Sequence, residues 1–156
     1  MQKTIMVVLT AVLACSTFGG QEALSMDLNQ FQWKNRLLFI FAPQEGDSIF
    51  QALQSEISTQ PDEISERYLV VFKIFETGPS YMGTTRIDPQ AAAIRTKFAA
   101  PFGQFTCILV GKDGGTKLKR HSRVKLEEVF DLIDAMPMRR EEMRQKSQSD
   151  ESKPTQ

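Results

Sequence analysis

A polar run that follows an apolar segment holds the first residues that could do chemistry. Residues 36–42 are apolar after one arginine and predict a buried strand, and directly after them come Gln44, Glu45, Asp47 and Ser48. Open α/β folds bind ligands at the carboxyl ends of their strands, so these side chains could form a polar binding edge. The favoured interpretation is structural, because Asp47 or Ser48 can cap a helix that starts here.

The chain has two cysteines, Cys15 and Cys107. Cys107 lies in the apolar segment 105–110, where we expect a buried, inert thiol that packs as a small hydrophobic side chain. A reactive thiol would need exposure and a basic neighbour that lowers its pKa, and the residues next to Cys107 supply neither. These residues favour a non-catalytic role. The alternative is a peroxiredoxin-like or other thiol-dependent oxidoreductase that uses Cys107.

The only histidine, His121, lies in a basic stretch. The stretch alternates lysines with other residues, as expected of an edge strand that lysine protects from aggregation, and we favour this interpretation. The functional alternative is a surface for an acidic protein, a polyanion or a cell-surface glycan. Its candidate contacts are Lys117, Lys119, Arg120 and Arg123. No aromatic residues are interleaved with them, which argues against binding of single-stranded nucleic acid.

Other function classes are excluded by missing residue patterns. One histidine, without cysteine or carboxylate at ligand spacing, predicts no metal site. The chain has neither a Ser-His-Asp set nor a Gly-x-x-x-x-Gly-Lys phosphate loop, and we predict no cofactor. Nineteen basic and 19 acidic side chains give a net charge of zero, so no overall field draws the chain to nucleic acid or to anionic membranes.

Residues 1–20 are expected to be an export signal. Lys3 supplies a positive charge, and residues 4–14 form an apolar run that is too short to span a bilayer. Two cleavage sites stay open. Residues 12–15 resemble a bacterial lipoprotein box, in which Cys15 would become the acylated first residue, whereas cleavage near residues 19–20 would release a secreted protein. Either route predicts a periplasmic or cell-surface protein, bound to the membrane only through a lipid anchor.

The remaining pattern predicts one domain at residues 35–146, between a lead-in at 21–34 and a disordered tail at 147–156. Helical and strand periodicities alternate within it. Strands are expected at 36–42, 68–75, 105–110 and 116–120, and helices at about 49–57, 61–67, 88–98, 125–135 and 138–146.

This order predicts a mixed four-stranded sheet. The first two connections contain helices and predict parallel crossovers, whereas the Asp113-Gly114 turn predicts an antiparallel pair. The arrangement β-α-β-α-β-β-α, flanked by helices, is an α/β thioredoxin-like fold. In that fold the junction after the first strand carries a redox dithiol, but here Glu45 and Ser48 stand where the two cysteines would fall. Thr106 stands where thioredoxins place a cis-proline.

Four sequence blocks add a family resemblance. They are KNRLLFIFAP at 34–43, RYLVVFKIFE at 67–76, FTCILVGKDGG at 105–115 and IDAMPMRREEM at 133–143, and the last is the most distinctive. Together they resemble the thioredoxin-like DUDES proteins, which occur as secreted bacterial proteins and as C-terminal domains of vertebrate sushi-repeat and coiled-coil matrix proteins. The resemblance implies the fold and no particular reaction.

The sequence therefore predicts an exported thioredoxin-like domain that lacks the dithiol and acts as a non-catalytic binding or adaptor module. The first candidate contact is the edge at residues 44–48 with Thr106 nearby. The second is the basic face at residues 117–123. The expected partner is an unidentified protein or an anionic molecule of the cell surface.

Overall fold

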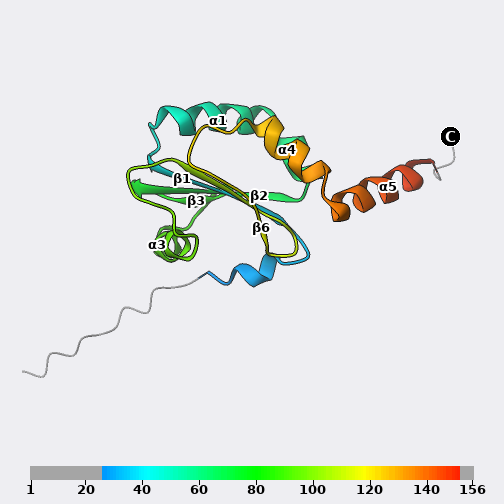
Figure 1. Ribbon diagram of the computed structural model, residues 1–156, viewed down its shortest axis with the longest axis horizontal. Coiled ribbons are helices and arrows are strands. Elements are labelled where there is room, and N and C mark those ends of the chain that lie inside the picture. Colours follow the sequence, from blue (N-terminus) through cyan, green and yellow to red (C-terminus); the bar gives the residue numbers. More distant parts are fainter. Residues whose placement is uncertain (1–25, 152–156) are drawn as a thin grey trace, which may run out of the picture.

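The computed structural model describes residues 26–151, and one six-stranded sheet forms its centre (Figure 1). The predicted export signal and Cys15 lie outside the described residues. The strand order is β4-β3-β2-β1-β5-β6. The strands are β1 (Arg36–Gln44), β2 (Leu69–Thr77), β3 (Tyr81–Met82), β4 (Thr85–Arg86), β5 (Thr106–Val110) and β6 (Thr116–Arg120).

The four predicted strands are present, but the prediction of a four-stranded sheet is wrong. The segment expected to be a loop between β2 and the next helix folds into the short hairpin β3–β4. It pairs with the outer edge of β2, where Met82 lies opposite Phe72. Gly83 closes the turn with a φ of 57°, and its N–H donates to the Val71 carbonyl at 2.8 Å. The free edge of β2 is therefore covered by a segment whose apolar pattern is too short to predict a strand.

The second crossover also differs from the prediction. β1 and β2 are parallel, as expected, but β5 runs antiparallel to β1. Thr106 at the start of β5 pairs with Phe41 near the end of β1, so the chain re-enters the sheet from the end where β1 finishes. A helix in a connection permits a parallel return but does not require one, because the segment that follows the helix sets the point of re-entry.

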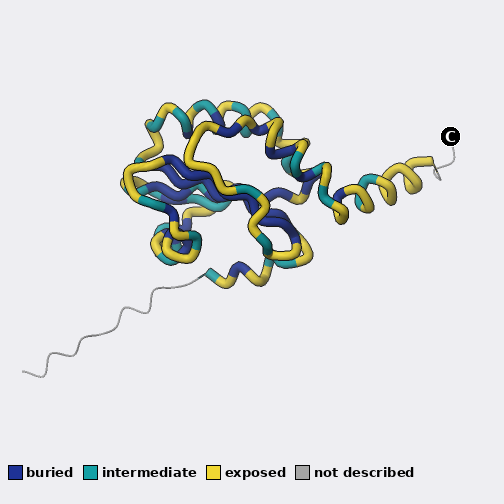
Figure 2. Tube along the Cα trace, viewed as in Figure 1, coloured by how far each residue is buried: buried dark blue, intermediate teal, exposed yellow. Residues whose placement is uncertain are grey.

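Alternate side chains of β1 face two separate halves of the core, as the two-residue period of a strand requires. Leu38 and Ile40 pack in the half beneath α1 (Ser48–Thr59) and α4 (Leu126–Asp134). Phe39 and Phe41 pack in the other half, with α3 (Asp88–Lys97) and the 3-10 helix η1 (Leu28–Phe31). Figure 2 shows the central strands buried between these layers.

The last two helices differ in their contact with the sheet, since α4 packs on it and α5 (Pro137–Glu151) does not. α4 turns Leu126, Val129, Phe130 and Ile133 inward, which confirms its predicted core face. α5 leads away from the body of the domain (Figure 1). The short α2 (Pro61–Glu66) follows α1 along the chain and precedes β2.

The predicted disordered tail is wrong for residues 147–151, which continue α5. Glu141 accepts hydrogen bonds from Arg144 at 2.6 Å and from Gln145 at 2.7 Å, so side-chain pairs along the helix surface support a segment that has few apolar residues. Residues 152–156 lie outside the described part.

Candidate functional site

The predicted edge after β1 is used to start α1. The Asp47 carboxylate accepts hydrogen bonds from the backbone N–H groups of Ile49 at 3.0 Å and Phe50 at 2.9 Å. This confirms its interpretation as a helix cap. Gln44 ends β1, Ser48 begins α1, and the backbone carbonyl of Glu45 accepts a hydrogen bond from the Gln51 side chain at 2.6 Å. Binding by this edge stays a prediction.

Thr106 does not add exposed surface to that edge. Its side chain is buried, and its hydroxyl lies 3.0 Å from Nδ1 of His121. The only histidine of the chain is thus the partner of a strand hydroxyl. Among residues 26–151, no group of three or more histidine, cysteine, aspartate or glutamate side chains is arranged to hold a metal ion.

The basic residues of the predicted second surface each have a partner. Their pairs are Lys117 with Asp113 at 2.6 Å, Lys119 with the Phe98 carbonyl at 2.9 Å, Arg120 with Glu128 at 3.5 Å, and Arg123 with Glu56 at 3.5 Å. Because acidic side chains or a carbonyl oxygen already engage these cations, the stretch presents less free positive charge than its sequence suggests. β6 lies at the edge of the sheet, which confirms the edge-strand interpretation.

Cys107 is fully buried in β5, between β1 and the edge strand β6. It pairs with Ile40 of β1 and with Arg120 of β6, and its side chain has no exposed surface. Burial raises the pKa of the Cys107 thiol to about 12. It is the only cysteine among residues 26–151, so the described chain presents no low-pKa thiolate at its surface.

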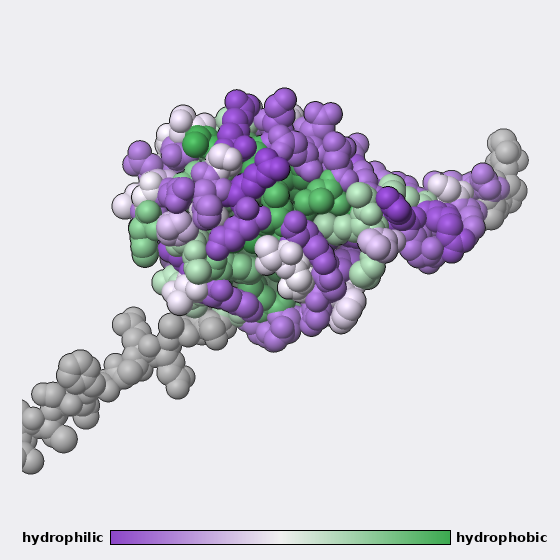
Figure 3. Space-filling model, viewed as in Figure 1, coloured by the Kyte–Doolittle hydropathy of each residue, from purple (hydrophilic) through white to green (hydrophobic). Residues whose placement is uncertain are grey.

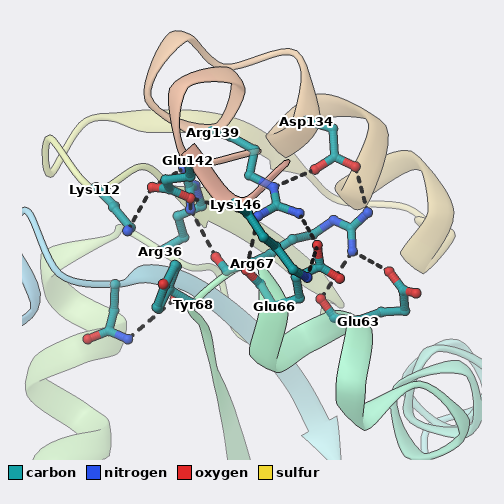
Figure 4. A network of polar contacts seen from close by, with 11 residues as sticks. Arg36, Glu63, Glu66, Arg67, Tyr68, Lys112, Asp134, Arg139, Glu142 and Lys146 are labelled. Atoms are coloured by element: carbon teal, nitrogen blue, oxygen red, sulfur yellow. Dashed lines mark hydrogen bonds and ion pairs between the residues drawn. The ribbon is translucent and has the colours of Figure 1, made fainter. Parts of the chain in front are cut away.

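A network of buried cations lies at the opposite end of the sheet, where β1 and β2 begin (Figure 4). Arg36 is 1% exposed and donates two parallel hydrogen bonds to the Glu142 carboxylate, at 3.1 and 3.2 Å. Lys112 is 8% exposed, lies 2.8 Å from the same carboxylate, and sits 4.0 Å above the ring of Tyr68. Two buried cations therefore share one carboxylate that α5 supplies.

A second half of the network ties the end of α4 to α2. Arg139 is buried and donates to Asp134 at 3.0 Å and to Glu66 at 3.0 Å. Arg67 donates to Asp134 at 2.5 Å and stacks 4.3 Å from the Phe130 ring. These bonds fix the angle at which α5 leaves α4.

The carboxylates of the network stay ionised. Burial alone raises the pKa of Glu142, but hydrogen bonds from Arg36 and Lys112 outweigh this effect and hold the pKa below its ordinary value. The same balance lowers the pKa of Asp134, where the bonds come from Arg67 and Arg139.

Beside this network lies a cavity of about 480 Å³, which we call the α4–α5 cavity. The turn between β5 and β6 forms one side, and the junction of α4 and α5 forms the other. Its charged lining consists of Arg36, Lys112, Asp113 and Lys117, and its apolar lining includes Leu132, Met136, Pro137 and Met138. Figure 3 shows hydrophobic residues gathered between α4 and β6, with hydrophilic residues around them.

Sequence reasoning missed this site. In the sequence, Arg36 indicates only the start of a strand, and Lys112 belongs only to a turn and to the basic stretch around His121. The usable signal was the distinctive block at 133–143, which supplies Asp134, Arg139 and Glu142 to the network. An arginine that opens a fully apolar strand was the second signal, since a buried guanidinium needs a partner.

Solved structures with a similar fold are peroxiredoxins. Thioredoxin peroxidase I from Plasmodium yoelii superposes with a TM-score of 0.55 at 15% identity, over 73% of this chain and 79% of that one. Reduced 2-Cys peroxiredoxin from Plasmodium vivax gives 0.56 at 14% identity, over 73% and 84%. At these identities the likeness concerns the fold alone, and it confirms the thioredoxin-like prediction.

Among residues 26–151, none of the helices combines the length and the apolar composition that a membrane span needs.

Relatives by sequence are vertebrate proteins of greater length. Coiled-coil domain-containing protein 80 from Danio rerio is 26% identical over 148 residues, which are 84% of this chain and 17% of that protein. Sushi repeat-containing protein SRPX from Rattus norvegicus is 29% identical over 120 residues, 74% of this chain and 26% of the relative. The chain thus spans about a quarter or less of these relatives.

These matches confirm the family resemblance predicted from the four sequence blocks. A family model described as a domain of unknown function, DUF4174, matches residues 27–142. The match extends from η1 to Glu142 of the cation network and therefore includes the whole sheet. This chain belongs to the DUF4174 family.

Proposed function

We propose that this protein is an exported binding module, built on a thioredoxin-like fold, that does not catalyse thiol chemistry. The observation that carries the proposal is the state of Cys107, which is buried in β5 with a pKa raised to about 12. At pH 8 only about one thiol in ten thousand would be ionised at that pKa, and the thiolate is the nucleophile. Peroxidase or exchange chemistry through Cys107 would first require the sheet to open.

The positions after β1 support the same proposal. The Asp47 carboxylate accepts hydrogen bonds from two backbone N–H groups of α1. Glu45 and Ser48 have no thiol that could take part in redox exchange. Export is supported by the apolar run at residues 4–14 and by the resemblance to secreted proteins.

A thiol titration tests the proposal. The Cys15→Ser variant of the full chain leaves Cys107 as the only thiol, and dithionitrobenzoate reports its reaction by absorbance. We expect no reaction within minutes at pH 8 under native conditions, and one equivalent once urea unfolds the chain. The Cys15→Ser/Cys107→Ser variant measures the background.

The alternative function, an oxidoreductase that uses Cys107, predicts the opposite result. A rapid native reaction, retained at pH 6, would require an accessible thiolate of low pKa and would refute the non-catalytic proposal. Consumption of hydrogen peroxide by the Cys15→Ser variant, lost in Cys15→Ser/Cys107→Ser, would refute it as well.

A further inference from the structure

The α4–α5 cavity has an excess of one positive charge. Arg36, Lys112 and Lys117 line it, and the carboxylates that pair with them are Glu142 and Asp113. Three cations against two carboxylates leave one unit of positive charge. Glu142 is shared between Arg36 and Lys112, and Arg139 lies 3.9 Å from it as well, so the unbalanced charge belongs to the buried cations around Glu142. A buried charge is costly without a counter-charge, and one monoanion would restore the balance.

Unused donors accompany this charge. Nε of Arg36 is buried and has no hydrogen-bond partner in the described structure. Each lysine ammonium carries three donors. The structure gives Lys112 one acceptor oxygen, on Glu142, and gives Lys117 one, on Asp113. An anion in the cavity could accept from these lysines without breaking either ion pair.

The N-terminus of α5 meets the same cavity through Pro137 and Met138. A helix N-terminus carries partial positive charge, which an acidic or capping side chain usually balances. The first turn of α5 has no acidic residue, and Met136, which precedes the helix, has no side-chain oxygen. This end of α5 therefore adds to the attraction for an anion, in contrast to α1, which Asp47 caps.

The wall formed by α4 and its junction with α5 suits an apolar group. Leu132, Met136 and Met138 line it, and Met138 is a large apolar side chain left exposed. Methionine side chains adapt to irregular apolar ligands. A volume of about 480 Å³ lies within the range of pockets that bind small organic molecules, which is about 300–1,000 Å³.

We infer that the α4–α5 cavity binds a small monocarboxylate with an apolar body. The carboxylate lies at Lys112, Lys117 and the start of α5, and the apolar body lies on Leu132, Met136 and Met138. This inference rests on the proposed function, because it names the ligand class of a module that binds and does not catalyse.

Methionine NMR tests the inference with decanoate as the probe. The chain has seven methionines, and the full chain labelled with ¹³C at the methionine methyl groups reports on each of them. We expect submicellar decanoate to shift Met136 and Met138 saturably, while Met82, which packs in the opposite half of the core, stays unchanged. Acetate should shift the same signals with at least tenfold weaker affinity, because it lacks the apolar body.

Two variants with the same loss of charge separate the site from general attraction. Lys117→Met removes a cavity cation and should weaken decanoate binding about tenfold, as expected for a hydrogen-bonded charge. Lys119→Met removes a lysine of the same strand whose ammonium donates to the Phe98 carbonyl and does not line the cavity. This variant should leave the affinity for decanoate within twofold. Lys117 is partly exposed, so its loss should not unfold the domain.

Several results would overturn the inference. Equal shifts with decyltrimethylammonium would mean that the cavity selects apolar chains without regard to charge. Equal weakening by Lys119→Met would mean general attraction, and unshifted Met136 and Met138 would mean no binding. Each of these would leave the proposed function standing if Cys107 stays unreactive, whereas a reactive Cys107 would refute the proposed function whatever decanoate does.

Discussion

Replacement of Glu142 by glutamine tests whether the buried cation network holds the domain together. The glutamine keeps the size of the side chain and removes the charge that Arg36 and Lys112 share. Both cations are more than 90% buried, so they have little contact with water except where they border the α4–α5 cavity. The variant therefore leaves two buried cations without their carboxylate.

The magnitude follows from the burial of the partners. Loss of one partner from a buried ion pair costs about 3–5 kcal/mol. Glu142 is itself 20% exposed, and the remaining glutamine oxygen still accepts one hydrogen bond, so we expect a loss of about 3 kcal/mol. Glu141→Gln is the matched control. That carboxylate lies next to Glu142 on the same helix and pairs with Arg144 on the surface, where water and salt screen the pair and it contributes little to stability.

Urea unfolding at pH 7, followed by circular dichroism, measures both variants against the natural chain. We expect the free energy of unfolding of Glu142→Gln to fall by about 3 kcal/mol and that of Glu141→Gln to stay close to the value of the natural chain. Equal small effects from the two variants would contradict this prediction, since they would mean that water solvates Arg36 and Lys112 well enough to replace Glu142.

Two further predictions follow from the caps and the carboxylates. Asp47→Ala removes two hydrogen bonds from the start of α1 and should lower the free energy of unfolding by about 1 kcal/mol, measured by thermal unfolding. Glu45→Ala is the control, because Glu45 accepts a hydrogen bond only through its backbone carbonyl. Equal effects of the two variants would contradict the capping role. Stability should also fall in acid. In the folded chain the pKa values of Glu142 and Asp134 lie below their ordinary values of 4.5 and 3.8. The unfolded chain therefore binds more protons at these two groups in acid. Their stabilisation is present above about pH 4.5 and is lost as the pH falls. Unfolding midpoints measured from pH 7 to pH 3 test this, and Glu142→Gln should show a weaker dependence.

The main elements could be predicted because their patterns are local. Residues 37–42 are apolar without interruption, as a strand covered on both faces requires, and the Asp113-Gly114 turn produces the antiparallel pair β5–β6. The hairpin β3–β4 could not be predicted, because two-residue strands carry no periodicity. The direction of β5 could not be predicted either, because the length of a helical connection does not specify the end at which the chain returns.

In the candidate site, too, the features that depend on neighbouring residues could be predicted and those that depend on distant residues could not. The capping role of Asp47 and the burial of Cys107 follow from their neighbours in the sequence, and both predictions are confirmed. The cation network could not be predicted, because Arg36 and Glu142 are 106 residues apart.

The four longer strands, most of the helices and the family resemblance follow from the amino-acid sequence alone. Those features depend on residue types at short spacing, which a chain carries before it folds. The sharing of Glu142 by Arg36 and Lys112, and the cavity bordered by Lys117 and the start of α5, arise only in the folded chain. The reason is that charge balance and cavity shape depend on distances between segments remote in sequence, which packing alone brings together.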